Sequence, residues 1–189
     1  NITSVLPLDY IVPGQCNFIR RVRVGLDIDH PYIGDLRVVL QDPNFDSFGG
    51  AGNISLLERT RNGINGTTGS CGADDIEAIF WDDSPIGPDR GCGLVPDRPA
   101  LSGYIAPAQA LSGLIARRGT DNNGASTVGT WRLVVRDLAN GDVGQLNDWS
   151  IEVECSTTPV LEADIEVTTL GNTSGIAGTP LNFGWRVRN

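Results

Sequence analysis

The sequence has no lysine and no methionine, and its only histidine is His30. All 14 basic residues are therefore arginines, set against 23 acidic residues, and the formal net charge is -9. Binding to a nucleic acid or to an anionic lipid surface needs a clustered positive field, so this balance argues against both partners. Cations are the expected small ligands.

Long hydrophobic runs are also lacking. No run approaches the roughly 18 apolar residues that a membrane span requires, so membrane insertion is not expected. The 24 glycines and 11 prolines separate many short apolar runs. Short runs with frequent turn residues are typical of β-rich folds and not of helical ones, so the sequence predicts an all-β protein.

The four cysteines lack the CxxC spacing of zinc and redox motifs, and with one histidine a zinc site is not expected. We predict a disulfide between Cys71 and Cys92, which would close a local loop. A second, between Cys16 and Cys155, would join the start of the first domain to its end. Four cysteines allow three connectivities, and buried free thiols are the alternative. Disulfides imply an oxidising compartment, and hence a secreted or cell-surface protein.

The clearest strand pattern lies between residues 129 and 154. Apolar residues occupy alternate positions in both halves of this segment: Trp131, Leu133, Val135, Trp149, Ile151 and Val153. Such alternation indicates half-buried strands, and the turn-rich centre around Asn140 and Gly141 predicts that they form a long-looped antiparallel β-hairpin. The apolar face of the hairpin requires a second layer, which the alternating runs at 18–28 and 35–41 would supply.

Further strands are predicted at 54–58 and within the acidic segment 74–83. Residues 1–15 contain two prolines and predict an extended lead-in, whereas the four prolines between 84 and 100 predict irregular structure.

The composition changes after Cys155. A Ser-Thr-Thr-Pro sequence is typical of a linker, so we place the first domain at 1–155 and the linker at 156–160. Two alternating runs then predict two strands within 161–189. Because two strands cannot bury a core alone, this part is either a truncated neighbouring domain or is docked on a partner surface.

Carboxylates gather at the ends of the predicted strands. Those that best suit a metal site are Asp27, Asp29, Asp35, Asp75, Asp82 and Asp83. A hard cation takes about 6 to 8 oxygen ligands, so calcium is the predicted ion if the acidic ends of the segment 74–83 meet the loop that follows Asp27. The alternative is that these carboxylates are solvated or cap turns by accepting hydrogen bonds from backbone amides.

The residues of a catalytic triad are lacking. A Ser-His-Asp triad needs an imidazole, His30 is the only one, and no GxSxG motif is present. We expect His30 to hydrogen-bond a turn. Since all four cysteines are expected in disulfides, a cysteine nucleophile is not expected either. The chain is therefore predicted to be non-catalytic by itself.

Four segments are similar, in order, to the P domain, also called the P/Homo B domain. They are HPYIGDLRVVLQDP at 30–43, DDIEAIFWDD at 74–83, PALSGYIAPAQALSG at 99–113 and GTWRLVVRDLANGDVGQLNDWSIEVE at 129–154. This module follows the catalytic domain in proprotein convertases and in many secreted bacterial subtilisin-like proteases, and several members bind calcium. The resemblance covers about residues 10–155 and implies a jelly-roll-like β-sandwich of about eight strands.

The resemblance implies a non-catalytic accessory domain of a secreted subtilisin-like serine protease. Such a domain packs beside the catalytic or a neighbouring domain of the parent chain, stabilises it and helps to orient protein substrates. The alternative is an adhesion or ligand-binding module of a large multidomain bacterial surface protein. The tail from Leu161 favours the alternative, because it resembles the first two strands of immunoglobulin-like modules of the cell-adhesion-related bacterial type.

Calcium binding is tested by thermal unfolding of the chain. We expect EDTA to lower the melting temperature and added calcium to restore it, because an ion that binds only the folded state stabilises it. A melt that neither EDTA nor calcium changes would contradict the prediction.

Overall fold

The computed structural model describes residues 2–8, 18–43, 53–94, 99–114, 129–156, 166–170 and 184–188 of the 189-residue chain. The chain divides into two compact units, Asn1–Pro159 and Val160–Asn189. Within the described residues, no helix is both long enough and apolar enough to cross a membrane.

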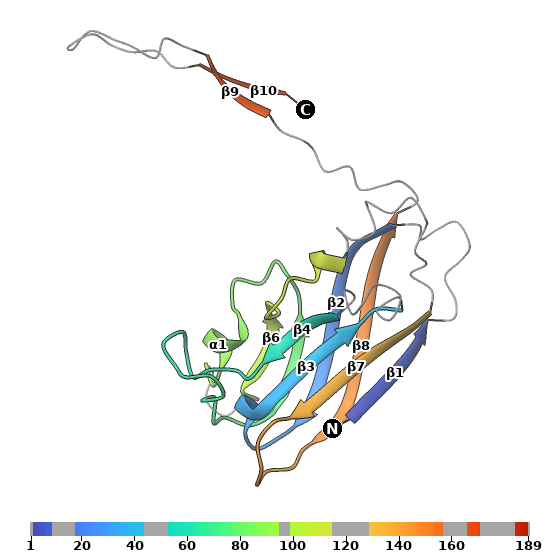
Figure 1. The fold of residues 1–189 in the computed structure, drawn as a ribbon, viewed down its shortest axis with the longest axis vertical. Helices are drawn as coiled ribbons and strands as arrows, with labels where there is room; N and C mark the ends of the chain where they lie inside the picture. Colours follow the sequence, from blue (N-terminus) through green and yellow to red (C-terminus); the bar gives the residue numbers. More distant parts are fainter. Residues whose placement is uncertain are drawn as a thin grey trace, which may run out of the picture. The chain divides into compact units, whose positions relative to one another are not determined.

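The first unit contains two four-stranded sheets (Figure 1). The first sheet has the order β1-β7-β3-β4, all antiparallel, with bounds Ile2–Leu8 for β1, Gly129–Asp137 for β7, Leu36–Gln41 for β3 and Asn53–Glu58 for β4. The second sheet has the order β6-β5-β2-β8, with bounds Leu101–Ile105 for β6, Ile76–Phe80 for β5, Phe18–Asp29 for β2 and Gln145–Ser156 for β8. Its pairs are antiparallel except for β5 and β6, which are parallel. The described helical elements include the 3-10 turn η1 (Ile33–Asp35) and the short helix α1 (Pro88–Gly91), and residues 112–114 are also helical.

The predicted all-β sandwich is confirmed, and its core lies between the two sheets. The alternating apolar residues of β2, from Val22 to Ile28, are all buried, as are Trp131 and Leu133 of β7. Phe80 at the end of β5 is also fully buried. Because successive side chains of a strand point to opposite faces, each sheet places one apolar row inward and leaves the other row outside.

The predicted β-hairpin between residues 129 and 154 is wrong. β7 pairs with β1 and β3 in the first sheet, whereas β8 pairs with β2 in the second, so the segment forms an arch between the sheets. In a hairpin both tryptophans would lie on one face and would need a third element to cover them. In the arch, Trp131 and Trp149 lie on the inner faces of opposite sheets, and Trp149 Nε1 donates a hydrogen bond to Ser4 Oγ at 3.0 Å.

Two other predictions are corrected by the structure. Residues 1–15 were expected to be an extended lead-in, but β1 is the edge strand of the first sheet, where Pro7 lies opposite Thr130. An edge strand tolerates proline because one row of its N–H groups has no partner strand. The sequence pattern also missed β6, a short strand that is interrupted by Gly103 with a positive φ of 71°.

The disulfide Cys71–Cys92 is confirmed and connects the loop after β4 to the end of α1. The same loop packs tightly on η1. Gly34 donates a backbone hydrogen bond to the Cys71 carbonyl at 2.9 Å, and a Cβ at Gly34 would lie 2.6 Å from the Gly69 carbonyl oxygen. The predicted bridge between Cys16 and Cys155 falls on positions whose side chains lie outside the described part of the chain.

The second unit contains β9 (Glu166–Leu170) and β10 (Gly184–Arg188), which form an antiparallel two-stranded sheet. The predicted C-terminal β extension is therefore present. Two strands alone do not distinguish an immunoglobulin-like module from other antiparallel β structure.

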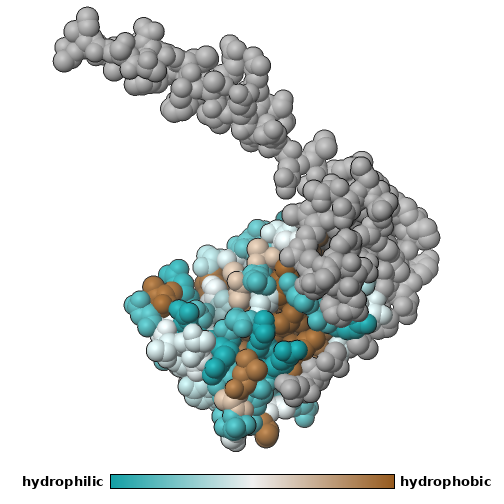
Figure 2. Space-filling view, viewed as in Figure 1, coloured by the Kyte–Doolittle hydropathy of each residue, from teal (hydrophilic) through white to brown (hydrophobic). Residues whose placement is uncertain are grey.

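Hydrophobic residues on the face seen in Figure 2 form small groups separated by hydrophilic residues. Isolated apolar residues of this kind are usual on a solvated surface, so this face does not by itself indicate a site.

We expect the variant Cys71→Ala/Cys92→Ala to unfold about 3 kcal/mol more easily than the natural chain in urea, because a bridge over a separation of 21 residues restricts the unfolded state. The far-UV circular dichroism of the folded variant should stay the same, and the m-value should rise, because the unfolded chain without the bridge is less compact. An unchanged unfolding midpoint would show that the bridge does not stabilise this fold.

Candidate functional site

The six predicted metal ligands lie at separate places in the sandwich. Two are on β2 (Asp27 and Asp29), one is in η1 (Asp35), and three flank β5 (Asp75, Asp82 and Asp83). The carboxylates on the two sides of β5 are separated by a five-residue strand, which spans roughly 15 Å, so they cannot share one ion. Among the described residues, no group of three or more His, Cys, Asp or Glu side chains could hold a metal ion. Calcium binding by this chain stays a prediction.

Asp75 completes the ladder between β2 and β5. Its Oδ1 accepts a hydrogen bond from the His30 N–H at 2.9 Å, and its own N–H donates to the His30 carbonyl at 3.0 Å. The residue has a φ of 65°, in the left-handed region that side chains other than glycine seldom adopt. Its carboxylate is therefore engaged by the backbone at the point where the chain turns into β5.

Asp82 fastens the other end of β5 to the segment that follows β6. Its two carboxylate oxygens accept hydrogen bonds from the backbone N–H groups of Leu111 and Ser112, each at 2.7 Å. Short bonds to an ionised acceptor are among the stronger hydrogen bonds in proteins. This is the turn-capping role that the sequence left open as the alternative to a metal site.

Asp35 is buried and forms an ion pair with Arg59, whose Nη2 lies 3.7 Å from Asp35 Oδ1. The guanidinium passes directly over Gly69, where a Cβ would lie 2.7 Å from Arg59 Nη2. The pair therefore holds the loop after β4 against η1.

Asp27 belongs to an acidic row that the sequence did not reveal. It lies directly opposite Glu77 of β5 and directly opposite Asp148 of β8, so three carboxylates lie side by side on the outer face of the second sheet. Glu77 and Asp148 were not among the predicted site residues. Each occupies an outward position in its strand, but only the register between strands places them beside Asp27.

His30 is buried at one end of the sandwich, with 2% of its surface exposed. Its Nδ1 accepts a hydrogen bond from the Tyr32 N–H at 3.2 Å, which confirms the predicted contact with a turn. In the neutral ring this places the proton on Nε2, which lies 3.6 Å from Asp137 Oδ2.

A cavity of 180 Å³ adjoins this histidine. The described residues that line it are Ile28, His30, Leu36, Val135, Asp137, Val143, Gly144, Gln145 and Leu146. None of these is a serine, threonine or cysteine. Among the described residues, the His-Asp pair therefore has no nucleophile beside it, so these residues do not form a catalytic triad.

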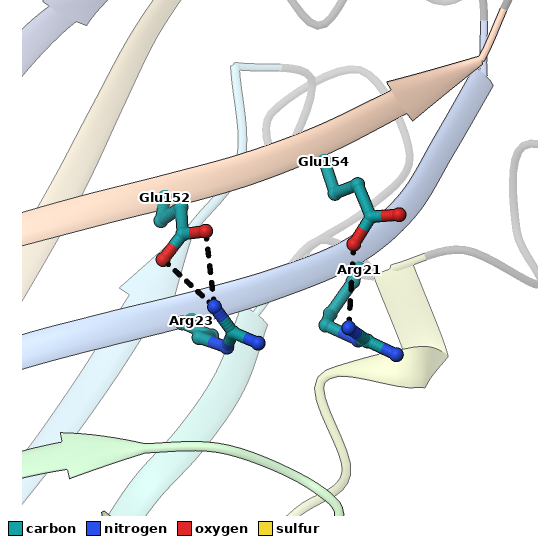
Figure 3. Close-up of polar contacts among 4 residues, drawn as sticks. All are labelled: Arg21, Arg23, Glu152 and Glu154. Carbon is teal, nitrogen blue, oxygen red and sulfur yellow. Dashed lines mark hydrogen bonds and ion pairs between the residues drawn. The ribbon is translucent and has the colours of Figure 1, made fainter.

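Opposite charges pair along the outer face of β2 and β8 beyond the acidic row. Arg23 contacts both carboxylate oxygens of Glu152 at 3.0 and 3.1 Å, and Arg21 contacts Glu154 at 3.3 Å (Figure 3). Both guanidinium groups also lie over the ring of Trp81, at 4.8 Å for Arg23 and 5.8 Å for Arg21. The second sheet therefore carries an ordered polar surface on its outer face.

We expect Asp82→Asn to lower the free energy of unfolding by about 1–2 kcal/mol, because the amide can accept at only one of the two positions that now bind backbone N–H groups. Urea unfolding should show the same decrease in the free energy of unfolding in the presence of EDTA and in the presence of calcium. Asp83→Asn removes the same charge from an exposed neighbour, and its effect should stay within about 0.5 kcal/mol. A loss seen only in calcium would identify Asp82 as a metal ligand instead.

One curated relative covers most of this chain. The "Calcium-dependent protease" of Nostoc sp. is 29% identical over 137 residues, which are 72% of this chain and 14% of the relative.

Two solved structures cover 82% of this chain and 20% of their own chains. They are the serine protease of Aeromonas sobria in complex with its chaperone, with 20% identity and a TM-score of 0.33, and the same protease alone, with 19% identity and a TM-score of 0.34. These scores are too low to support a comparison of folds, so the fold rests on the strands described above.

A family model also matches part of the chain. The model described as "Proprotein convertase P-domain" matches residues 107–153, a range that contains β7 and most of β8. Since the chain spans 14% of the length of the curated relative, the comparison concerns one segment of a larger protein. Over residues 107–153, this chain is thus similar to the proprotein convertase P-domain.

Proposed function

We propose that this chain is a non-catalytic accessory β-sandwich domain of a secreted subtilisin-like serine protease. The observation that carries the proposal is the match of residues 107–153 to the proprotein convertase P-domain. The matched segment includes the arch of β7 and β8, which contributes a strand to each sheet. The curated relative, of which this chain spans 14%, is a protease by name.

A stabilising role agrees with the physical character of the sandwich. Its buried carboxylate, its capping carboxylates and its disulfide order the loops around η1 and β5. Ordered loops can form an interface with a catalytic or neighbouring domain of the parent chain at little entropic cost. Through such an interface the domain would stabilise the parent protein and help to orient protein substrates.

An extracellular location is part of the proposal. The bridge between Cys71 and Cys92 persists in oxidising compartments and is rare in the reducing cytosol. Calcium belongs to the proposal only through the name of the Nostoc relative, because the described carboxylates do not assemble around one ion.

A second candidate is an adhesion or ligand-binding module of a multidomain surface protein. The observation that favours it is the second compact unit, whose strands β9 and β10 follow the sandwich along the chain. Serial β modules of this kind, of which an immunoglobulin-like module is our candidate for residues 161–189, display binding surfaces away from a cell. The two candidates differ in what else the same polypeptide contains.

The test uses the complete polypeptide encoded by the gene that contains this sequence. We expect a subtilisin-like catalytic domain in the same chain. Deletion of residues 1–156 should shorten the half-life of its protease activity at a fixed elevated temperature by about tenfold, because the interface that slows unfolding is lost.

Deletion of residues 160–189 is the matched control and should change the half-life by less than about twofold. A polypeptide without a protease domain, or a half-life that is the same after both deletions, would contradict the accessory role. Adhesive repeats in place of the protease would support the second candidate.

A further inference from the structure

The acidic row on the outer face of the second sheet is electrostatically unfavourable by itself. Asp27 faces Glu77 on one side and Asp148 on the other, in positions where paired Cβ atoms lie about 5 Å apart. Like charges directly opposite one another destabilise a sheet. The Asn147 amide donates to Asp27 Oδ1 at 3.1 Å, but among the described residues no arginine forms an ion pair with any of the three carboxylates.

The same strands pair opposite charges elsewhere. The outward residues of β2 that precede Asp27 and Gly25 are Arg23 and Arg21. Across the pair of β2 and β8, Arg23 lies opposite Glu152 and Arg21 lies opposite Glu154 (Figure 3). The sheet therefore compensates its outer charges at these positions and leaves them uncompensated in the acidic row. Departures of this kind from local rules are expected where a surface has a binding role.

An open hollow of 410 Å³ lies beside the acidic row. Gly25 forms part of its lining, between Ile79 of β5 and Ser150 of β8 in register. A Cβ at Gly25 would lie 2.5 Å from Ser150 Oγ, so any larger residue there would intrude on this space. Ile79 is 38% exposed, and its parallel neighbour Tyr104 is 54% exposed. The hollow is thus lined by the three carboxylates and by Ile79 of β5, and the exposed Tyr104 of β6 lies next to Ile79.

Side chains on the sheet face beside the hollow are held in place by contacts within the protein. The rings of Trp81 and Tyr104 meet edge to face at 5.5 Å, and Arg23 lies over Trp81 while it is bound to Glu152. Side chains that are already ordered lose little entropy when a ligand binds.

We propose that this surface binds an extended segment of a partner protein that carries an arginine. We call it the acidic trough and define it by Glu77, Asp27, Asp148, Gly25, Ile79 and Tyr104. The guanidinium group of the arginine lies over the acidic row. The methylene groups of the same side chain and the residues next to it in the partner segment cover Ile79 and Tyr104. A guanidinium carries five N–H donors in a rigid fork, so it can contact two carboxylates of the row at once and relieve their repulsion.

Charge and spacing favour such a segment over a bare metal ion. Glu77 and Asp148 are two strand spacings apart, roughly 10 Å, with Asp27 between them, so one guanidinium can contact two neighbouring carboxylates of the row. The three carboxylates do not form a group that could hold a metal ion. The net charge of -9 also attracts a basic partner at long range. The proposal holds whether the parent protein is a protease or an adhesin.

The test uses the 189-residue chain and the peptide Gly-Arg-Leu-Arg-Gly-amide, labelled with fluorescein at its N-terminal amine. We expect saturable binding in fluorescence polarisation that weakens as salt is raised, and no binding of the matched peptide in which glutamine replaces both arginines. Glu77→Gln/Asp148→Asn should weaken binding of the arginine peptide by about tenfold. Gly25→Val should also weaken it, because it fills the hollow without a change of charge.

The matched control is Asp74→Asn/Asp83→Asn, which removes two exposed charges outside the trough and should leave the dissociation constant within about twofold. Glu77→Gln/Asp148→Asn should also melt at the same or a higher temperature, because it removes like-charge repulsion. Equal weakening by the control would show that net charge alone attracts the peptide, and equal binding of the glutamine peptide would show an apolar surface only. Either result would overturn the proposal. A third contradicting result would be a natural chain that does not bind the peptide but melts at a higher temperature in calcium, with this rise abolished by Glu77→Gln/Asp148→Asn.

Discussion

The structure depends on the alternation of side chains along β2. This 12-residue strand pairs with β5 on one side and β8 on the other, so it lies in the middle of the second sheet. Its inner row, from Val22 to Ile28, is buried against the first sheet, while its outer row carries Arg21, Arg23, Gly25 and Asp27. A shift of one residue would exchange the two rows, placing charges in the core, so burial of one face holds the register of the whole sheet. The same register determines which charges meet outside.

Two groups of carboxylates in this protein differ in their environment. Those near η1 and β5 are used internally: Asp35 pairs with Arg59, and Asp75 and Asp82 accept backbone hydrogen bonds. They order loops that have no regular ladder of their own. Among the described residues, the acidic row has no such internal use apart from the amide that contacts Asp27, and it lies on the outer face of the second sheet. The distinction separates carboxylates that build the domain from those that are available to a partner.

The strands were largely predictable, because alternation is a local property of the chain. The runs that became β2, β3, β4, β5, β7 and β8 all show it or are bounded by clear turn residues. β1 and β6 were missed, since a proline interrupts one and a glycine with positive φ the other. The candidate site was less predictable. Asp27 was identified as a candidate, but its two neighbours were not, because Glu77 lies 50 positions and Asp148 lies 121 positions away along the chain.

The sequence by itself determined that the protein is all-β, which face of the clearly alternating strands is buried, and which local cysteine pair can close a loop. These properties follow from the period of two along a strand and from short-range spacing. Only the tertiary structure decided that Trp131 and Trp149 lie on the inner faces of opposite sheets and that Asp27 lies between Glu77 and Asp148. The physical reason is that strand pairing depends on which distant segments together bury the most apolar area, and a local sequence pattern does not contain this information.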